Sequence, residues 1–215
     1  MVMIIGMIGS GNIGSTLGKN WAEAGHHVMF SSRHPEELNQ LVVGIGSNVK
    51  ACSIKDVFEA DADVYVLAMP FYAIDKLSEL YAGEYADTTI IDVTNPYPHR
   101  DGDMAKEVLD ANYNASEYTA MKFGTAKTAK AFNTIPADDL DKFAFNTKEK
   151  VAIPFAAQDE MSKKISEQLI SDIGFDPVYI GNLSDSRIMD PNEDLYGHTL
   201  PLKELNDKIK SLRQV

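Results

Sequence analysis

Short apolar runs rich in β-branched and aromatic residues alternate along the chain with longer amphipathic segments. The short runs are typical of buried strands, and apolar positions recurring every three or four residues are typical of helices. Strands are expected near Val2–Met7, His27–Phe30, Val64–Ala68, Thr89–Asp92, Ala129–Phe132, Val151–Pro154 and Val178–Ile180, with a weaker one near Val49–Cys52. Helices are expected near Ile13–Ala24, Glu36–Leu41, Ile54–Ala60, Ile74–Tyr81, Met104–Leu109, Asp138–Phe143, Ser162–Ile173 and Leu202–Leu212. This alternation predicts βαβ units wound into a doubly wound, mainly parallel α/β sheet.

The two most irregular stretches are residues 95–102 and 190–201, and neither has the composition of an interdomain linker. The first follows a predicted strand directly, so it should lie above the carboxyl edge of the sheet, where open α/β folds bind ligands. We expect a single domain over residues 1–187. A partly helical C-terminal extension over residues 188–215 would complete a pocket or a dimer contact.

A glycine-rich loop stands between the first predicted strand and the first predicted helix. Gly9, Gly11 and Gly14 match the pattern G-x-G-x-x-G. The first glycine permits a tight turn, the second lets the backbone approach a pyrophosphate, and the third lets helix and strand pack closely, which Gly18 would extend. Such a motif alone can be an ordinary turn, but its place in the first βαβ unit favours a Rossmann-type dinucleotide-binding domain.

The end of the second predicted strand indicates which dinucleotide binds. NAD enzymes place an Asp or Glu there to accept a hydrogen bond from the adenosine 2′-hydroxyl. This chain instead has Ser32 followed by Arg33, whose planar fork of donors suits a 2′-phosphate. We therefore expect NADP(H) rather than NAD, the alternative being that Arg33 is only a solvated loop cation.

Composition and residue spacing argue against several other kinds of partner and of active site. Twenty Lys and Arg against 32 Asp and Glu give a formal charge of −12, which disfavours nucleic acid and anionic membranes as partners. The single cysteine, Cys52, fits a reducing compartment and reads best as a small core residue. The apolar start lacks a basic segment and is too short to span a membrane, so a cytoplasmic location is expected. The five histidines show no metal-ligand spacing, and no nucleophile elbow is present, so neither a metal nor a hydrolytic triad is expected.

Four stretches together give a more specific indication. They are residues 9–14, Ser32-Arg33, residues 91–96 (Ile-Asp-Val-Thr-Asn-Pro) and residues 130–136 (Lys-Ala-Phe-Asn-Thr-Ile-Pro). Together they resemble the coenzyme F420-dependent NADP oxidoreductase family and the related cytosolic oxidoreductase domain of six-transmembrane metalloreductases. A fifth stretch, residues 173–187, looks like the family's closing strand and turn.

The resemblance implies hydride transfer between NADP(H) and a flavin or deazaflavin such as coenzyme F420, with no catalytic side chain, because the protein chiefly positions two rings and excludes water. It also implies a homodimer. Gly9, Ser10, Gly11, Asn12 and Ile13 would hold the phosphates. The other implied contacts are Ser32 and Arg33 for the 2′-phosphate, Met69 and Pro70 for the nicotinamide, and Asn95 and Asn133 for the pocket of the second ring.

Two departures from the family affect the acceptor side of this expectation. After Arg187 the chain reads Ile-Met-Asp-Pro-Asn-Glu-Asp, where the family continues into an apolar helix that walls the pocket and joins subunits. Asn133 stands where the deazaflavin enzymes have histidine. Two alternatives therefore stay open. One is a dehydrogenase of the hydroxyacid or pyrroline-carboxylate reductase type, although the residues after Arg187 are too few to build the helical domain of such enzymes. The other is a non-catalytic NADP(H)-binding sensor or partner protein.

Overall fold

The computed structural model of the chain describes residues 1–82, 87–111, 113–124 and 127–214. Within these residues, eight strands form one sheet in the order β3-β2-β1-β4-β5-β6-β7-β8. Their bounds are β1 Ile4–Ile8, β2 His27–Ser32, β3 Val49–Ser53, β4 Val64–Leu67, β5 Thr89–Asp92, β6 Thr128–Ala131, β7 Ala152–Ala157 and β8 Asp176–Gly181. Among these eight described strands, β6 and β7 are the one neighbouring pair that runs antiparallel. The expected Rossmann-type, mainly parallel α/β fold is confirmed.

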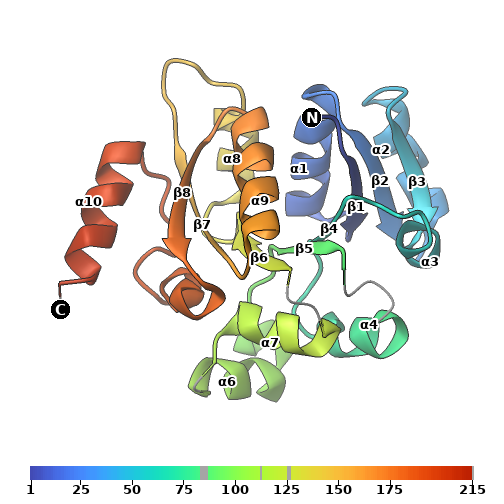
Figure 1. Cartoon of the computed structure of the whole chain (residues 1–215). Coiled ribbons are helices and arrows are strands. Elements are labelled where there is room, and N and C mark those ends of the chain that lie inside the picture. Colours follow the sequence, from blue (N-terminus) through green and yellow to red (C-terminus); the bar gives the residue numbers. More distant parts are fainter. Residues whose placement is uncertain (83–86, 112, 125–126, 215) are drawn as a thin grey trace.

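Helices cover both faces of the sheet, with α10 beside β8 at one end and α2 and α3 at the other (Figure 1). The α-helices are α1 Asn12–Glu23, α2 Asn39–Val43, α3 Ile54–Phe58, α4 Ala73–Tyr81, α5 Pro98–Asp101, α6 Asp103–Asp110, α7 Ala115–Phe123, α8 Ala137–Phe143, α9 Glu160–Asp172 and α10 Leu202–Leu212. Two 3-10 helices, η1 Pro35–Leu38 and η2 Leu183–Met189, complete the described elements.

Each predicted strand and helix has an observed counterpart, and the prediction near Glu36–Leu41 corresponds to η1 followed by α2. Three helical elements, α5, α7 and η2, are not predicted from the apolar pattern. Helix α7 escapes prediction because most of its buried positions carry small or hydroxyl side chains, so its inner face has no apolar stripe. Its local signal is a capping box, in which the Asn114 side chain accepts from the amides of Ser116 and Glu117.

Apolar side chains form a core on each face of the sheet. On one face, side chains of β1, β2, β4 and β5 pack with α1, α8 and α9; on the other, they pack with α3, α4, α6 and α7. Trp21 of α1 is fully buried, donates from Nε1 to the Leu169 carbonyl at 2.9 Å, and meets the Phe132 ring edge-on at 5.6 Å between centroids. The first face therefore joins both halves of the sheet.

The residues after Arg187 form a third apolar cluster. Met189, Leu195, Leu205 and Ile209 pack on β7 and β8, and the Ala152 amide donates to the Leu200 carbonyl. The 3-10 helix η2 runs across residue 187 without a break. The division of the chain at residue 187 stays a prediction. Among the described residues, no helix combines the length and apolar character needed to cross a membrane.

Candidate dinucleotide-binding site

The loops that carry the expected site residues meet at one edge of the sheet. Strands β1, β2, β4, β5 and β6 run in parallel, so the segments that follow them all leave at their carboxyl ends. Strand β1 lies between β2 and β4, and the chain winds outward from it in both directions. This point of reversal is where open α/β sheets bind ligands.

Two glycines of the loop after β1 are required by the backbone geometry. Gly9 has a φ of +105°, and a Cβ there would lie 2.5 Å from the Ala68 carbonyl oxygen. A Cβ on Gly14 would lie 2.3 Å from the Gly9 carbonyl oxygen. Gly11 differs, because nothing lies within 4 Å of its Cβ position. Gly9 and Gly14 thus hold the loop close to Ala68, just after β4, whereas Gly11 leaves open space beside the backbone.

The open space lies at the amino end of α1. Gly11 is the N-cap residue, so no side chain accepts from the first amides of the helix, and its first turn has no acidic residue. Unsatisfied amides and the helix dipole at such an end attract anions. Ser10 and Ile13 are half-buried there, and Asn12 is exposed. The end of α1 can therefore accept a phosphate group without rearrangement of a capping side chain.

A cation stands at the end of the neighbouring strand. Arg33 is exposed, and its guanidinium has no hydrogen bond or ion pair within the described chain. Ser32 Oγ accepts from the His34 amide at 3.1 Å, and the nearby Glu36 carboxylate is 3.4 Å from His34 Nδ1. The tip of β2 thus offers a hydroxyl and an unpaired guanidinium, as the sequence predicts for a 2′-phosphate site.

Asp101 fixes the loops after β4 and β5 relative to each other. Its buried carboxylate accepts from the Tyr72 amide at 3.3 Å and the Tyr97 amide at 2.8 Å, and it receives two hydrogen bonds from Arg100 at 2.9 and 2.8 Å. Arg100 also donates to the Asn95 carbonyl at 2.8 Å. Met69 and Pro70, which the resemblance places near the nicotinamide, are half-buried in the first of these loops.

Two amide side chains join the ends of β5 and β6. Asn133 Nδ2 donates to Asn95 Oδ1 at 3.1 Å and to the Met189 carbonyl at 2.7 Å, while Asn95 Nδ2 donates to the Asn133 carbonyl at 2.9 Å. Because carbonyl oxygens only accept, both amide orientations are fixed. Asn133 is 4% exposed and its Oδ1 has no partner in the described residues. Phe132 before it has a φ of +61°, a strained conformation that turns the chain at this point.

Buried charges lie beneath these amides. The side chains of Lys130 and Asp92 are 0% exposed with Nζ and Oδ2 3.2 Å apart, and Asp92 also accepts from the Thr94 amide and from Thr119 Oγ1. Lys130 donates to the Thr94 carbonyl, so the ion pair supports the backbone just before Asn95. Asp190 is 1% exposed and accepts from the Ala115 amide through one oxygen only. Burial raises the pKa of Asp190 to about 6, against the lowering effect of Lys130.

A pair of tyrosines at the same edge is absent from the sequence prediction. The hydroxyl groups of Tyr97 and Tyr196 are hydrogen-bonded to each other, and Tyr196 comes from the irregular stretch after η2. Burial and the Tyr196 hydroxyl raise the pKa of Tyr97 well above its usual range. No sequence periodicity marks Tyr196, and only the irregularity of residues 190–201 pointed to this segment.

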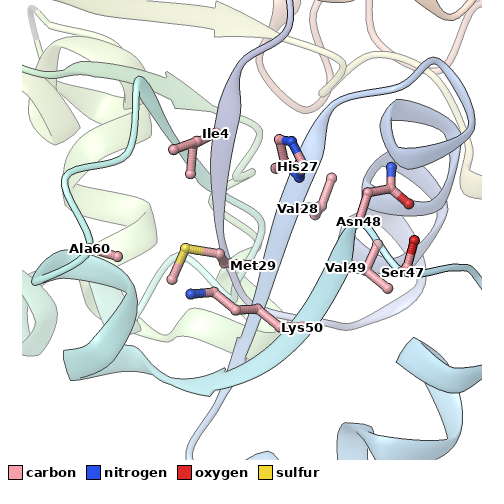
Figure 2. A pocket seen from close by; sticks show the side chains of 9 residues that line it. All are labelled: Ile4, His27, Val28, Met29, Ser47, Asn48, Val49, Lys50 and Ala60. Atoms are coloured by element: carbon pink, nitrogen blue, oxygen red, sulfur yellow. The ribbon is translucent and has the colours of Figure 1, made fainter.

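A hollow of about 440 Å³ lies at the opposite, amino edge of β1, β2 and β3, where its lining residues include Ile4, His27, Met29 and Lys50 (Figure 2). It is therefore separate from the glycine loop. Among the described residues, no three His, Cys, Asp or Glu side chains are grouped to hold a metal. Cys52 is buried, and burial raises the pKa of its thiol, as befits a core residue.

The fold and this edge define a Rossmann-type domain equipped to bind a phosphorylated dinucleotide. The model of the family described as "NADP oxidoreductase coenzyme F420-dependent" matches residues 4–96. The resemblance to this family of NADP-dependent oxidoreductases that the sequence led us to expect is therefore confirmed over that segment.

Relatives extend the similarity beyond the matched segment. Metalloreductase STEAP3 of Rattus norvegicus is 26% identical over 183 residues, which are 85% of this chain and 35% of that protein. The chain thus spans about a third of this curated relative's length. Solved structures include the hypothetical protein SMa0349 of Sinorhizobium meliloti, at 26% identity and a TM-score of 0.79, covering 93% of this chain and 95% of that one. A candidate F420-dependent NADP reductase from Arthrobacter sp. FB24 shares the fold, at 23% identity and a TM-score of 0.70, with 86% and 87% covered.

Proposed function

We propose that the chain binds NADP(H) across the carboxyl edge of the sheet. The amides at the start of α1, with Gly9, Ser10, Gly11, Asn12 and Ile13, hold the pyrophosphate. Two features at neighbouring strand ends support this placement: an uncapped helix end with open space at Gly11, and an unpartnered guanidinium at Arg33. They also overcome the unfavourable field of a protein with a net charge of −12.

Arg33, with Ser32, binds the 2′-phosphate and so selects NADP(H) over NAD(H). A guanidinium makes paired, charge-assisted hydrogen bonds to phosphate oxygens, and NAD(H) offers it only a hydroxyl. The nearby Glu36 carboxylate lies 3.4 Å from His34 Nδ1 and forms no ion pair with Arg33. The Arg33 guanidinium therefore has no carboxylate partner in the described chain. This unpaired guanidinium is the single observation that carries the choice of cofactor.

The second half of the proposal is hydride transfer to a flavin or deazaflavin bound beside the nicotinamide. The bound dinucleotide supplies the hydride, and the chain supplies position and exclusion of water. Met69 and Pro70 border the nicotinamide in a loop that Asp101 fixes to the loop bearing Asn95. Asn133 holds Asn95 and the Met189 carbonyl together, which gives the acceptor side a fixed floor.

A non-catalytic NADP(H)-binding protein is the second candidate. The observation that favours it is the coverage of the β6 end by the end of η2 and the residues after it, which leaves Asn133 4% exposed and bonded to the Met189 carbonyl. If that coverage excludes a second ring, dinucleotide binding alone would be the function. Binding of NADPH does not separate the two candidates, because both require it.

Anaerobic stopped-flow mixing of the NADPH-saturated protein with coenzyme F420, FMN or FAD separates them. The proposal predicts NADPH oxidation by at least one acceptor at a rate that saturates with acceptor concentration. NADPH binding without oxidation by any acceptor would support the binding-only candidate. If NADPH does not bind at all, both candidates fail.

A further inference from the structure

The Tyr97–Tyr196 pair lies where an acceptor would have to bind. Tyr97 lies in the loop after β5, two residues beyond Asn95. Tyr196 directly precedes Gly197, whose amide donates at 2.9 Å to the carbonyl of Thr134 in the loop after β6. The two rings meet edge-on, with centroids 6.3 Å apart, and both are half-buried. Two distant segments thus bring their hydroxyl groups together at the ends of β5 and β6.

The tyrosine pair has one O–H donor that its mutual hydrogen bond does not use. Each phenol carries a single O–H donor, and the bond between the two hydroxyls uses only one of them. The Asn95 side chain also lies near Tyr97 and lowers the pKa of its hydroxyl, against the larger raising effect of burial. Whichever tyrosine donates to the other, one phenolic proton has no acceptor in the described chain.

The surroundings of the tyrosine pair keep that proton in place. Burial and the neighbouring hydroxyl hold the pKa of Tyr97 above its usual range, so this phenol stays protonated at neutral pH. The Arg100 guanidinium, paired with the Asp101 carboxylate, lies 4.8 Å from the centroid of the Tyr97 ring and helps to fix that ring. In a half-buried position, a fixed O–H donor stabilises negative charge that develops on a bound molecule.

We propose that this tyrosine pair donates its spare hydrogen bond to the acceptor heteroatom on which negative charge develops during hydride transfer. The inference rests on the proposed function and narrows its substrate class to acceptors with a conjugated carbonyl oxygen or ring nitrogen, which flavins, deazaflavins and quinones share. The hydride leaves the nicotinamide C4 with its electron pair and bonds to the acceptor, whose π pair moves to that heteroatom. A proton from water completes the reduction, and NADP+ remains; the tyrosines themselves lose no proton.

Substitutions that remove one hydroxyl at a time test this role. Tyr97→Phe and Tyr196→Phe each delete the mutual hydrogen bond and keep the ring. Tyr179→Phe is the matched control, because Tyr179 lies on β8 and its hydroxyl makes no hydrogen bond in the described chain. The measurement is the single-turnover rate of NADPH oxidation at saturating coenzyme F420, FMN or 9,10-phenanthrenequinone, alongside the dissociation constant of NADPH and the thermal midpoint.

We expect one or both site variants to lose about tenfold to 100-fold in hydride-transfer rate, with NADPH affinity unchanged and the Tyr179 variant equal to wild type. Lower thermal midpoints with unchanged hydride-transfer rates in both variants would mean that the pair only tethers the C-terminal segment, and would overturn the inference while the proposed function stands. If one variant does not fold, the other decides. Wild-type protein that binds NADPH but reduces none of the three acceptors would overturn the proposed function along with the inference.

Discussion

Replacing Arg33 by alanine should remove the preference for NADPH over NADH. Arg33 is exposed and makes no hydrogen bond or ion pair in the described chain, so its loss leaves no buried group unsatisfied and should not affect folding. A hydrogen bond to a charged group contributes about 1.5 to 3 kcal/mol. Exposure to solvent and salt places this one in the lower half of that range. About 1.5 to 2 kcal/mol corresponds to about a 10- to 30-fold loss of NADPH affinity.

NADH affinity should stay the same in the Arg33 variant, because NADH has no 2′-phosphate. The assay is a fluorescence titration of each reduced dinucleotide into wild type and variant, at low and high salt. Wild-type discrimination should shrink as salt rises, because the Debye length falls from about 10 Å at 0.1 M to about 3 Å at 1 M. Lys164→Ala removes the same charge from the exposed face of α9 and serves as the control. An unchanged ratio of NADPH to NADH affinity in the Arg33 variant would refute the assigned role.

Three further predictions concern the loop and the buried charges. Gly11→Ala should keep the thermal midpoint but weaken NADPH binding at least about tenfold, because its Cβ enters the open space. Gly14→Ala should instead lower the thermal midpoint, because its Cβ would lie 2.3 Å from the Gly9 carbonyl oxygen. Lys130→Met should cost about 3 to 5 kcal/mol in chemical denaturation, because it leaves Asp92 and Asp190 buried without their cation; a loss below about 1 kcal/mol would contradict this. The raised pKa of Asp190 makes its contribution to stability greatest below the unfolded value of 3.8, and that contribution is lost as the pH rises through about 6. The difference in unfolding free energy between wild type and Asp190→Asn should therefore fall by up to about 3 kcal/mol between pH 4 and pH 7, and a difference that does not vary with pH would disprove the assignment.

The glycine loop and the tip of β2 could be predicted because their function depends on local chemistry. Gly14 must lack a Cβ because it would meet the carbonyl oxygen of Gly9, five residues earlier, and Gly9 itself adopts a positive φ that favours glycine. The absence of an Asp or Glu at the end of β2, where Ser32 and Arg33 stand, is likewise visible in a few consecutive residues. The doubly wound sheet follows from the alternation of short, continuously apolar strands with amphipathic helices, whose apolar faces cover both sides of the sheet.

The acceptor side could not be predicted because its contacts join segments far apart in the sequence. Tyr97 and Tyr196 are 99 residues apart, and Asn133 and Met189 are 56 apart. Nothing in the apolar pattern of residues 190–201 marks them as the cover of β6. Asn95 and Asn133 were expected from the resemblance to border the acceptor pocket, and this role stays a prediction, although the structure joins their side chains.

A crystal structure of the protein with NADPH would show directly where the dinucleotide binds. We expect the pyrophosphate against the first amides of α1, the 2′-phosphate within hydrogen-bond distance of the Arg33 guanidinium, and the nicotinamide beside Met69 and Pro70. NADPH bound anywhere else, for example in the hollow at the amino edge of β1 to β3, would contradict it.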